Sequence, residues 1–243
     1  MAKVSEYNRK RNFNITSEPA DEDVKVPTKR KPAALRFVVQ KHDARHLHYD
    51  FRLELDGTLK SWAVPKGPSL DPKDKRLAVH VEDHPLSYRN FEGSIPHGQY
   101  GAGDVIVWDQ GIWQPLEDPA KAYKTGKLKF TLTGEKLTGD WALVRTNLRG
   151  SGDKEQWLLI KERDQAARNA DDYDIVSEQP QSVISGTLVG GAQRKEDVGK
   201  KTSAAKKIAE EAQKKSPSVK EKSPRSSVFS KPLRFLILCI AIS

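Results

Sequence analysis

The stretch HLHYDFRLEL, residues 46–55, alternates ionisable and apolar side chains. Successive side chains of a β-strand point to opposite faces, so this alternation predicts a strand with one face packed into a core. The other face carries His46, His48, Asp50 and Arg52 in succession. A solvated strand face usually carries Lys, Glu, Thr and Ser, so these clustered titratable groups indicate a functional site.

Two of these side chains suit a metal ion. His48 and Asp50 are two positions apart on one strand face, so both can reach the same ion. His42, which precedes the expected strand, can complete a set of two histidines and one carboxylate. Such groups bind first-row divalent metals, and three protein ligands leave open positions for water and substrate. The spacing therefore predicts a catalytic metal site rather than a structural one.

Arg52, the next residue on that face, suits a phosphate, because a guanidinium offers paired donors to its oxygens. A second segment, RLAVHVEDH, repeats the alternation. It is expected to place Arg76, His80, Glu82 and His84 on one polar face. Of these, Glu82 and His84 are suited to proton transfer beside a phosphate.

Together these groups indicate metal-assisted phosphoester hydrolysis. Non-haem iron oxygenases share the set of two histidines and one carboxylate, but the dense Arg and Lys around the site disfavour that alternative. A rival of another class is a module that holds nucleic-acid ends without cleaving them, and the intact metal and arginine set argues against it. Spacing alone does not choose between Mn²⁺, Co²⁺ and Zn²⁺, since imidazole ligands accept all three.

Eight short runs rich in Val, Ile, Phe and Trp are bounded by turn residues and predict β-strands. No helices alternate with them, so the pattern favours an all-β, mainly antiparallel sandwich or barrel. We also expect a short helix near 116–123, a hairpin turn at ELDG (54–57) and a tight loop at GQYGAG (98–103). The runs cover residues 35–40, 46–55, 60–65, 76–83, 104–111, 127–134, 140–146 and 156–163.

The two ends of the chain differ from its middle in composition. Residues 1–33 are polar and are expected to form an extended N-terminal arm before a folded domain at 34–190. Residues 191–243 are rich in Lys, Ser and Ala and predict a disordered, basic tail. Of the net charge of +9, residues 192–243 carry +8. The domain must therefore select its partners through particular residues rather than through bulk charge.

The remaining features bear on location. Cys239 is the single cysteine, which fits a reducing compartment. The first residues lack the apolar run of a secretory signal. The apolar stretch FLILCIAIS is shorter than the roughly 20 residues that span a bilayer. These features predict a cytoplasmic protein without a membrane partner.

Several long stretches are similar to a known family. They are RFVVQKHDARHLHYDFRLELDG, SWAVPKGPS, RLAVHVEDHPLSYRNFEGSIPHGQYGAGDVIVWDQGIW and QWLLIKERD, with YNRKRNFNITSEP in the arm. From about Tyr7 to Gly190 the chain closely resembles the 3′-phosphoesterase module of bacterial ATP-dependent DNA ligase D, which also occurs as a stand-alone protein. The resemblance implies a compact β-barrel and a manganese-dependent enzyme. Such enzymes remove 3′-terminal ribonucleosides and 3′-phosphates from DNA and leave 3′-OH ends for repair ligation.

The resemblance also implies a role for particular residues. The family's arm usually has Asp where this chain has Asn12, so we expect a weaker ribonucleoside-removing step. The implied set is His42, His48 and Asp50 as metal ligands, Arg52 and His84 as phosphate contacts, Lys66, Arg76, Glu82 and Tyr88 as further active-site residues, and Arg11 and Glu18 for the ribonucleoside step.

The expected partners follow from the same resemblance. They are DNA 3′ ends in a primer–template or duplex, together with ligase, polymerase or end-binding proteins of a repair complex. The protein itself is expected to be a monomer. Glu54 stands where a ligase nucleotidyl-lysine motif would need Lys, so we do not expect this chain to seal ends.

Overall fold

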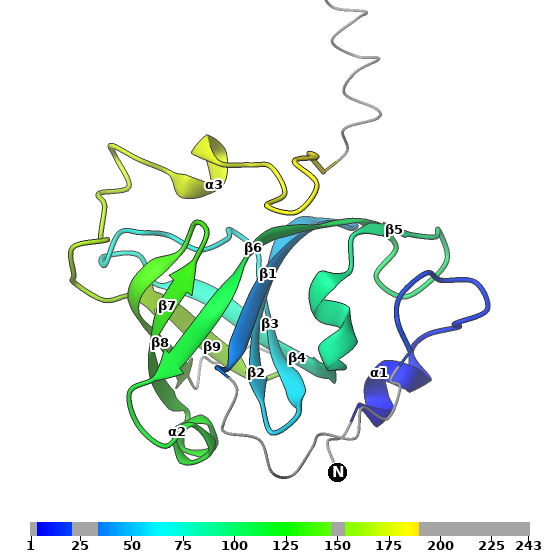
Figure 1. Cartoon of the computed structure of the whole chain (residues 1–243), viewed down its shortest axis with the longest axis horizontal. Helices are drawn as coiled ribbons and strands as arrows, with labels where there is room; N and C mark the ends of the chain where they lie inside the picture. The colour runs from blue at the N-terminus through cyan, green and yellow to red at the C-terminus, as the bar shows by residue number, and fades with distance from the viewer. Residues whose placement is uncertain (1–3, 21–33, 147–153, 190–243) are drawn as a thin grey trace, which may run out of the picture. The chain divides into compact units, whose positions relative to one another are not determined.

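Pairing between the first and the sixth strand closes the sheet into a barrel (Figure 1). The strand order is β1-β2-β3-β4-β9-β8-β7-β6, every pairing is antiparallel, and β5 adds a short ninth strand beside β6. The computed structural model describes residues 4–20, 34–146 and 154–189. The expectation of an all-β, antiparallel barrel is confirmed.

Each of the eight expected strands is present, and the expected short helix is α2. The hairpin turn between β2 and β3 has positive φ angles at Asp56 (53°) and Gly57 (79°), which is the backbone of a tight two-residue turn. The strands are β1 (Arg36–Asp43), β2 (Leu47–Leu55), β3 (Thr58–Val64), β4 (Arg76–His84), β5 (Gly93–Ile95), β6 (Gly103–Pro115), β7 (Lys127–Gly134), β8 (Thr138–Thr146) and β9 (Gln156–Lys161). The helices are α1 (Ser5–Arg9), the 3₁₀ helix η1 (Leu86–Asn90), α2 (Pro119–Thr125) and α3 (Ile175–Glu178).

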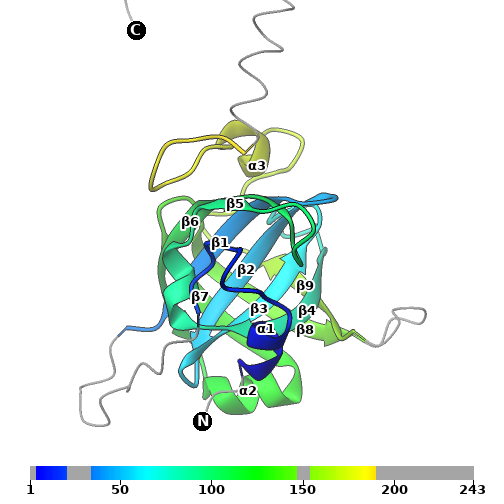
Figure 2. The same ribbon diagram turned by 90° about the vertical axis from the view of Figure 1, so that its right-hand side faces the viewer.

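Large side chains fill the interior of the barrel. Its core contains all five tryptophans, and each of them is at most 1% exposed: Trp62, Trp108, Trp113, Trp141 and Trp157. Residues of α2 and α3 join this core, and the two helices lie at opposite ends of the barrel (Figures 1 and 2). Because the interior is closely packed, the polar side chains of β1 and β2 must point outward.

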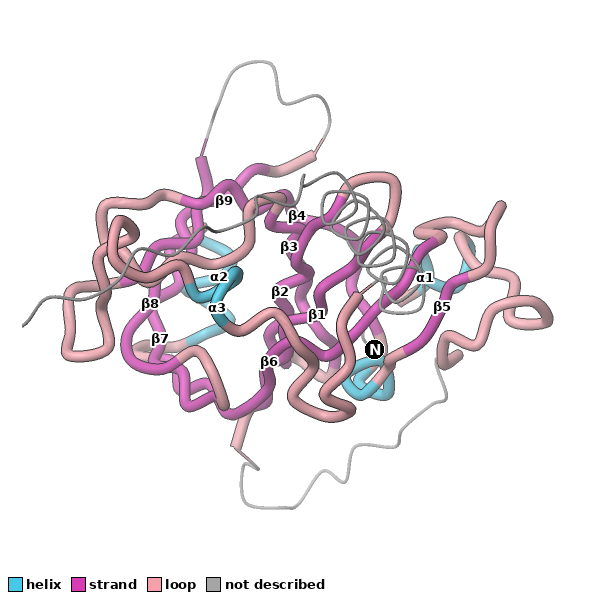
Figure 3. The backbone as a smooth tube through the Cα atoms, turned by 90° about the horizontal axis from the view of Figure 1, so that it is seen from above, coloured by secondary structure: helices cyan, strands magenta, loops and turns pink. Residues whose placement is uncertain are grey.

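A second apolar cluster covers the outer face of the wall formed by β1 to β4. It joins Val4 and Tyr7 of the N-terminal segment with Leu59 of β3, Tyr88 of η1 and Ile95 of β5. Seen from above, α1 and β5 lie on the side of this wall that faces away from β7 and β8 (Figure 3). The outward polar face is therefore enclosed between the barrel wall and these outer segments.

Two structural expectations are corrected. The N-terminal arm is not extended throughout, because Ser5–Arg9 form α1 and Tyr7 is completely buried against the barrel. In addition, the polar face expected for β4 is broken by a bulge. Leu59 and Ser61 of β3 are two residues apart, but their partners His84 and Val81 are three apart.

The bulge changes which side chains of β4 face outward. His80, expected beside His84, instead packs on the core, with its ring centroid 5.6 Å from that of Trp62. His84 returns to the outer face, where it lines the same pocket as Val81 and Glu82.

Other expectations fall partly or wholly outside the described residues. The basic tail predicted at 191–243 lies beyond them, as does much of the arm. Within the described ranges, no helix is long and apolar enough to cross a membrane.

Candidate metal-dependent active site

The three expected metal ligands meet on the outer face of β1 and β2. His42 and His48 are direct cross-strand partners, so their side chains project from the same side, and Asp50 follows two residues along β2. One ligand atom from each of the three residues lies within 4.8 Å of the others. His42 therefore belongs to the neighbouring strand β1, which runs three residues past the end expected at residue 40.

Backbone carbonyl groups fix which ring nitrogen of each histidine carries the proton. Nε2 of His42 lies 2.8 Å from the carbonyl oxygen of Gly101, and Nδ1 of His48 lies 2.9 Å from that of His46. A carbonyl group only accepts, so these nitrogens donate. Nδ1 of His42 and Nε2 of His48 therefore keep their lone pairs, as ligating histidines do when a carbonyl orients them.

Both lone pairs face the carboxylate of Asp50. Nδ1 of His42 and Nε2 of His48 each lie 3.7 Å from an oxygen of Asp50, which is too far for a hydrogen bond. Burial alone would raise the pKa of the Asp50 carboxyl, but the guanidinium of Arg52 holds it well below its usual value. Three electron-rich donors that converge in this way fit a divalent cation.

Arg52 organises the floor of the pocket. Its guanidinium is buried and donates to Asp50 Oδ2 (3.0 Å), to Ser61 Oγ (2.8 Å) and to Gln40 Oε1 (2.8 Å). These hydrogen bonds hold the positively charged guanidinium directly beside the three metal-ligand candidates. A substrate phosphate there would meet a fixed guanidinium rather than a mobile one.

His84 lies between two arginines. Its Nδ1 is 3.0 Å from Nη1 of Arg52, and its Nε2 is 3.3 Å from Nη2 of Arg11. Guanidinium groups can only donate, so a doubly protonated imidazole would offer neither of them an acceptor. Burial, followed by the charges of Arg52 and Arg11, keeps the pKa of His84 well below its usual value. His84 is therefore held in its neutral form, in which one ring nitrogen has a lone pair.

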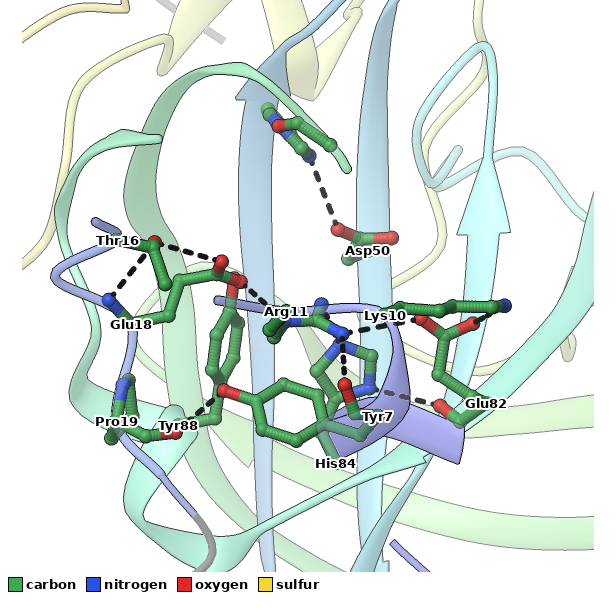
Figure 4. A network of polar contacts seen from close by, with 12 residues as sticks. Tyr7, Lys10, Arg11, Thr16, Glu18, Pro19, Asp50, Glu82, His84 and Tyr88 are labelled. Carbon is green, nitrogen blue, oxygen red and sulfur yellow. Dashed lines mark hydrogen bonds and ion pairs between the residues drawn. The ribbon is translucent and has the colours of Figure 1, made fainter. Parts of the chain in front are cut away.

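The arm closes the pocket through Arg11 (Figure 4). Its Nε donates to Glu18 Oε1 at 2.8 Å, and Nη1 lies 3.5 Å from Glu82 Oε1. Tyr88 Oη donates to the same oxygen of Glu18 at 3.0 Å, and Lys10 Nζ donates to Glu82 Oε2 at 3.1 Å. The arm residues therefore connect directly to residues of β4 and η1, and they form part of the site.

Most of the expected site residues share one pocket of about 220 Å³. Glu18 lies behind its wall, bonded to Arg11 and Tyr88. Lys66 is exposed in the turn that follows β3, and Arg76 pairs with Asp74 at 2.9 Å; neither lines the pocket. The expected residues that line it are Arg11, His42, His48, Asp50, Arg52, Glu82, His84 and Tyr88.

Sequence reasoning missed one residue that supports the site. Gln40 is completely buried, directly opposite Asp50 on the neighbouring strand. Its amide donates to the carbonyl oxygens of Tyr88 and Phe91, which turns its own oxygen toward Arg52. A glutamine two residues before His42, on the same strand face, was the signal available in the sequence.

Comparison with known proteins assigns the chain to a family. Residues 40–145 match the model of the DNA ligase D 3′-phosphoesterase domain. The multifunctional non-homologous end joining protein LigD of Pseudomonas aeruginosa is 60% identical over 182 residues, which cover 75% of this chain and 21% of that protein. The multifunctional non-homologous end joining DNA repair protein LigD of Mycobacterium tuberculosis is 40% identical over 194 residues, 77% of this chain and 23% of that protein.

The chain thus spans about a fifth of the length of the curated relatives that it matches. The matched region contains β2 to β7, the second half of β1, nearly all of β8, and all three metal-ligand candidates. The likeness and the fold agree with the resemblance seen in the sequence. This chain contains a domain of the DNA ligase D 3′-phosphoesterase family, matched over residues 40–145.

Proposed function

We propose that this protein is a metal-dependent phosphoesterase that processes DNA 3′ ends. It removes 3′-terminal ribonucleosides and 3′-phosphates and leaves 3′-OH ends for repair ligation. The observation that carries the proposal is the convergence of His42, His48 and Asp50 beside the buried guanidinium of Arg52 in one pocket. Family membership and the end-joining names of the relatives support DNA as the partner.

A divalent ion held by His42, His48 and Asp50 would polarise phosphoryl oxygens and lower the pKa of water. Family likeness favours Mn²⁺, although the donor set also accepts Co²⁺ or Zn²⁺. Arg52 is placed to stabilise the charge that shifts onto the phosphate oxygens in the transition state. Neutral His84, 3.0 Å from Arg52, is placed to accept or relay a proton.

The remaining pocket residues hold these groups in place. Glu82 accepts from Lys10 and lies close to Arg11, which ties β4 to the arm. Glu18 fixes Arg11 and Tyr88 through one carboxylate oxygen. Arg11 thus lines the pocket as a second guanidinium, and the sequence resemblance gives it a role in the ribonucleoside-removing step. Ligase, polymerase or end-binding proteins of a repair complex would be the proteins that use the 3′-OH product.

Product mapping on defined ends tests this function. Two 5′-labelled primer–templates are used, one ending in a single ribonucleotide and one ending in a 3′-phosphate. With Mn²⁺, the protein should convert both to 3′-OH strands, and Asp50→Ala should convert neither. His46→Ala is the matched control, because the His46 side chain is exposed and only its carbonyl group contacts His48. If the wild-type protein binds both ends but cleaves neither with Mn²⁺, Co²⁺ or Zn²⁺, the protein is an end-binding module instead.

A further inference from the structure

The mouth of the pocket carries an aromatic ring that the phosphoester chemistry does not use. Tyr100 lines the pocket together with the metal-ligand set, and it is 46% exposed. Among the large apolar residues that are exposed in the described ranges, it is the single aromatic one. Single exposed apolar residues scattered over a protein surface are normal, but an exposed ring at the wall of a reaction pocket suggests a ligand contact.

The backbone holds this ring at a fixed place beside the metal site. Tyr100 lies in the loop between β5 and β6, which is closed by backbone hydrogen bonds from Gln99 to Pro96 and from Ala102 to Gln99, each 3.1 Å. The next residue, Gly101, adopts φ = +76° and accepts the 2.8 Å hydrogen bond from His42. The ring is therefore one residue away from a direct contact with a metal ligand.

Two arm cations orient the ring. Lys10 Nζ lies 4.8 Å from the ring centroid of Tyr100, and the guanidinium carbon of Arg11 lies 5.9 Å from it. Both distances are within the range of cation–π attraction. Because the residue stays 46% exposed, much of the ring remains open to a ligand.

The pocket also offers more than a phosphate requires. Its walls also include the apolar side chains of Ala44, Ala63, Val81 and Ile95. Its volume of about 220 Å³ equals roughly seven waters at about 30 Å³ each, and a phosphate group fills only part of it. Apolar walls and one open ring suit the sugar and base of a nucleoside.

We propose that Tyr100 stacks on the nucleobase of the terminal nucleoside next to the reacting phosphate. The inference rests on the proposed 3′-end function and adds to it a binding site for the base. Every base has a π-face, so the contact would tolerate any sequence. It would also place the scissile bond, because the same loop orients His42.

A fluorescent terminal base tests the contact without hydrolysis. The strand ends in 2-aminopurine 3′-phosphate and is added to chelator-treated protein. Stacking should quench the fluorescence with the wild-type protein and with Tyr100→Phe, but not with Tyr100→Ala. Leu116→Ala is the matched control, since it removes an exposed apolar side chain that does not line the pocket. Quenching that survives in Tyr100→Ala would overturn the proposal.

Hydrolysis rates with Mn²⁺ provide a second test of the stacking contact. Tyr100→Ala should lower kcat/KM by about ten-fold on a strand with a normal 3′-terminal nucleotide, as expected for the loss of one stacked base. The loss should shrink to less than about two-fold on a strand whose terminal sugar is abasic, because no base is there to stack.

Equal losses on both strands would show that Tyr100 only supports the loop and His42. A loss in Tyr100→Phe as large as in Tyr100→Ala would assign the effect to the hydroxyl group, and would also overturn the proposal. Failure of the proposed function would give a different result from failure of the stacking proposal. The wild-type protein would then hydrolyse neither strand, while the fluorescence experiment would still report whether the base stacks on Tyr100.

Discussion

Nη2 of Arg52 donates a 3.0 Å hydrogen bond to Oδ2 of Asp50, and both side chains are buried. The residue that we propose binds phosphate therefore also holds a proposed metal ligand in position. Removing one partner of such a buried pair leaves the other charge without its compensation. Metal binding and phosphate binding are consequently expected to respond together to changes at Arg52.

Replacing Arg52 tests this link. Arg52→Ala should abolish 3′-phosphatase activity and weaken metal binding by about ten- to hundred-fold, the usual effect of removing a residue that orients a ligand. Arg52→Lys should recover little activity, because one ammonium cannot replace the contacts to Gln40, Ser61 and Asp50. Activity assays and metal titrations on the same preparations give both quantities.

Arg36→Ala provides the control for the loss of one positive charge. Arg36 is exposed on β1 and does not line the pocket, so its removal should leave metal binding intact. Full activity in Arg52→Lys would reduce Arg52 to a general positive charge. Undiminished metal binding in Arg52→Ala would separate the two roles that the structure links.

The depressed pKa of His84 predicts a pH effect on stability. The folded protein keeps His84 neutral, but the unfolded chain takes up a proton near pH 6.5. The free energy of unfolding should therefore fall as the pH drops below about 6.5, by up to about 1.4 kcal/mol per pH unit for this group. Asp109 has the opposite effect on the free energy of unfolding. Burial raises its pKa to about 6, so the folded state takes up a proton at a higher pH than the unfolded chain and gains stability as the pH drops.

Comparison of wild type with His84→Gln isolates the histidine. In the presence of chelator, the variant should lose less stability than wild type between pH 6.5 and pH 5, as measured by urea unfolding. Asp109→Asn should change the slope in the opposite sense. Parallel stability curves for wild type and His84→Gln would mean that His84 has the same pKa in the folded and unfolded states.

The sequence departure at Asn12 predicts that the two 3′ reactions separate. Oδ1 of Asn12 accepts from the backbone N–H of Asn14 at 3.2 Å, and an aspartate can make the same bond. Asn12→Asp should therefore fold normally, add a negative charge beside Arg11, and raise ribonucleoside removal selectively. The ratio of the two rates on matched substrates is the measurement. An equal change in both rates, or no change, would remove Asn12 from the account.

The charge distribution predicts a role for residues 192–243, which carry a net charge of +8. Deleting them should weaken DNA binding at low salt and flatten its salt dependence, by a slope of about 0.9 for each duplex phosphate that these residues neutralise. Turnover at saturating substrate should change little, because the pocket lies entirely within the described domain. Identical salt slopes for the full-length and truncated chains would show that this segment does not touch DNA.

Local patterns in the sequence predicted the strands and the chemistry of β2. Side-chain alternation is a property of the strand itself, so His48, Asp50 and Arg52 could be assigned to one face before any pairing was known. The place of His42 depended on pairing between strands. Its spacing in sequence suggested a ligand, but only the register sets it directly opposite His48.

The errors arise where tertiary contacts override a local pattern. The bulge in β4 depends on pairing with β3, and it turns His80 toward the core while His84 stays in the pocket. Likewise, α1 gains its burial from packing on the barrel, which the polar composition of the arm does not reveal. Lys66, in the turn after β3, and Arg76, at the start of β4, do not line the pocket, and their active-site role stays a prediction.

We propose that His42, His48 and Asp50 hold the ion on which hydrolysis depends. The most direct measurement titrates Mn²⁺ into chelator-treated protein and records, at each step, bound ion and hydrolysis of a 3′-phosphate-terminated duplex. One ion should bind per chain, and activity should rise in proportion to occupancy. His48→Ala and Asp50→Ala should lack both, and His46→Ala should match wild type. Hydrolysis at full rate without bound metal, or an undiminished metal site in Asp50→Ala, would contradict the account.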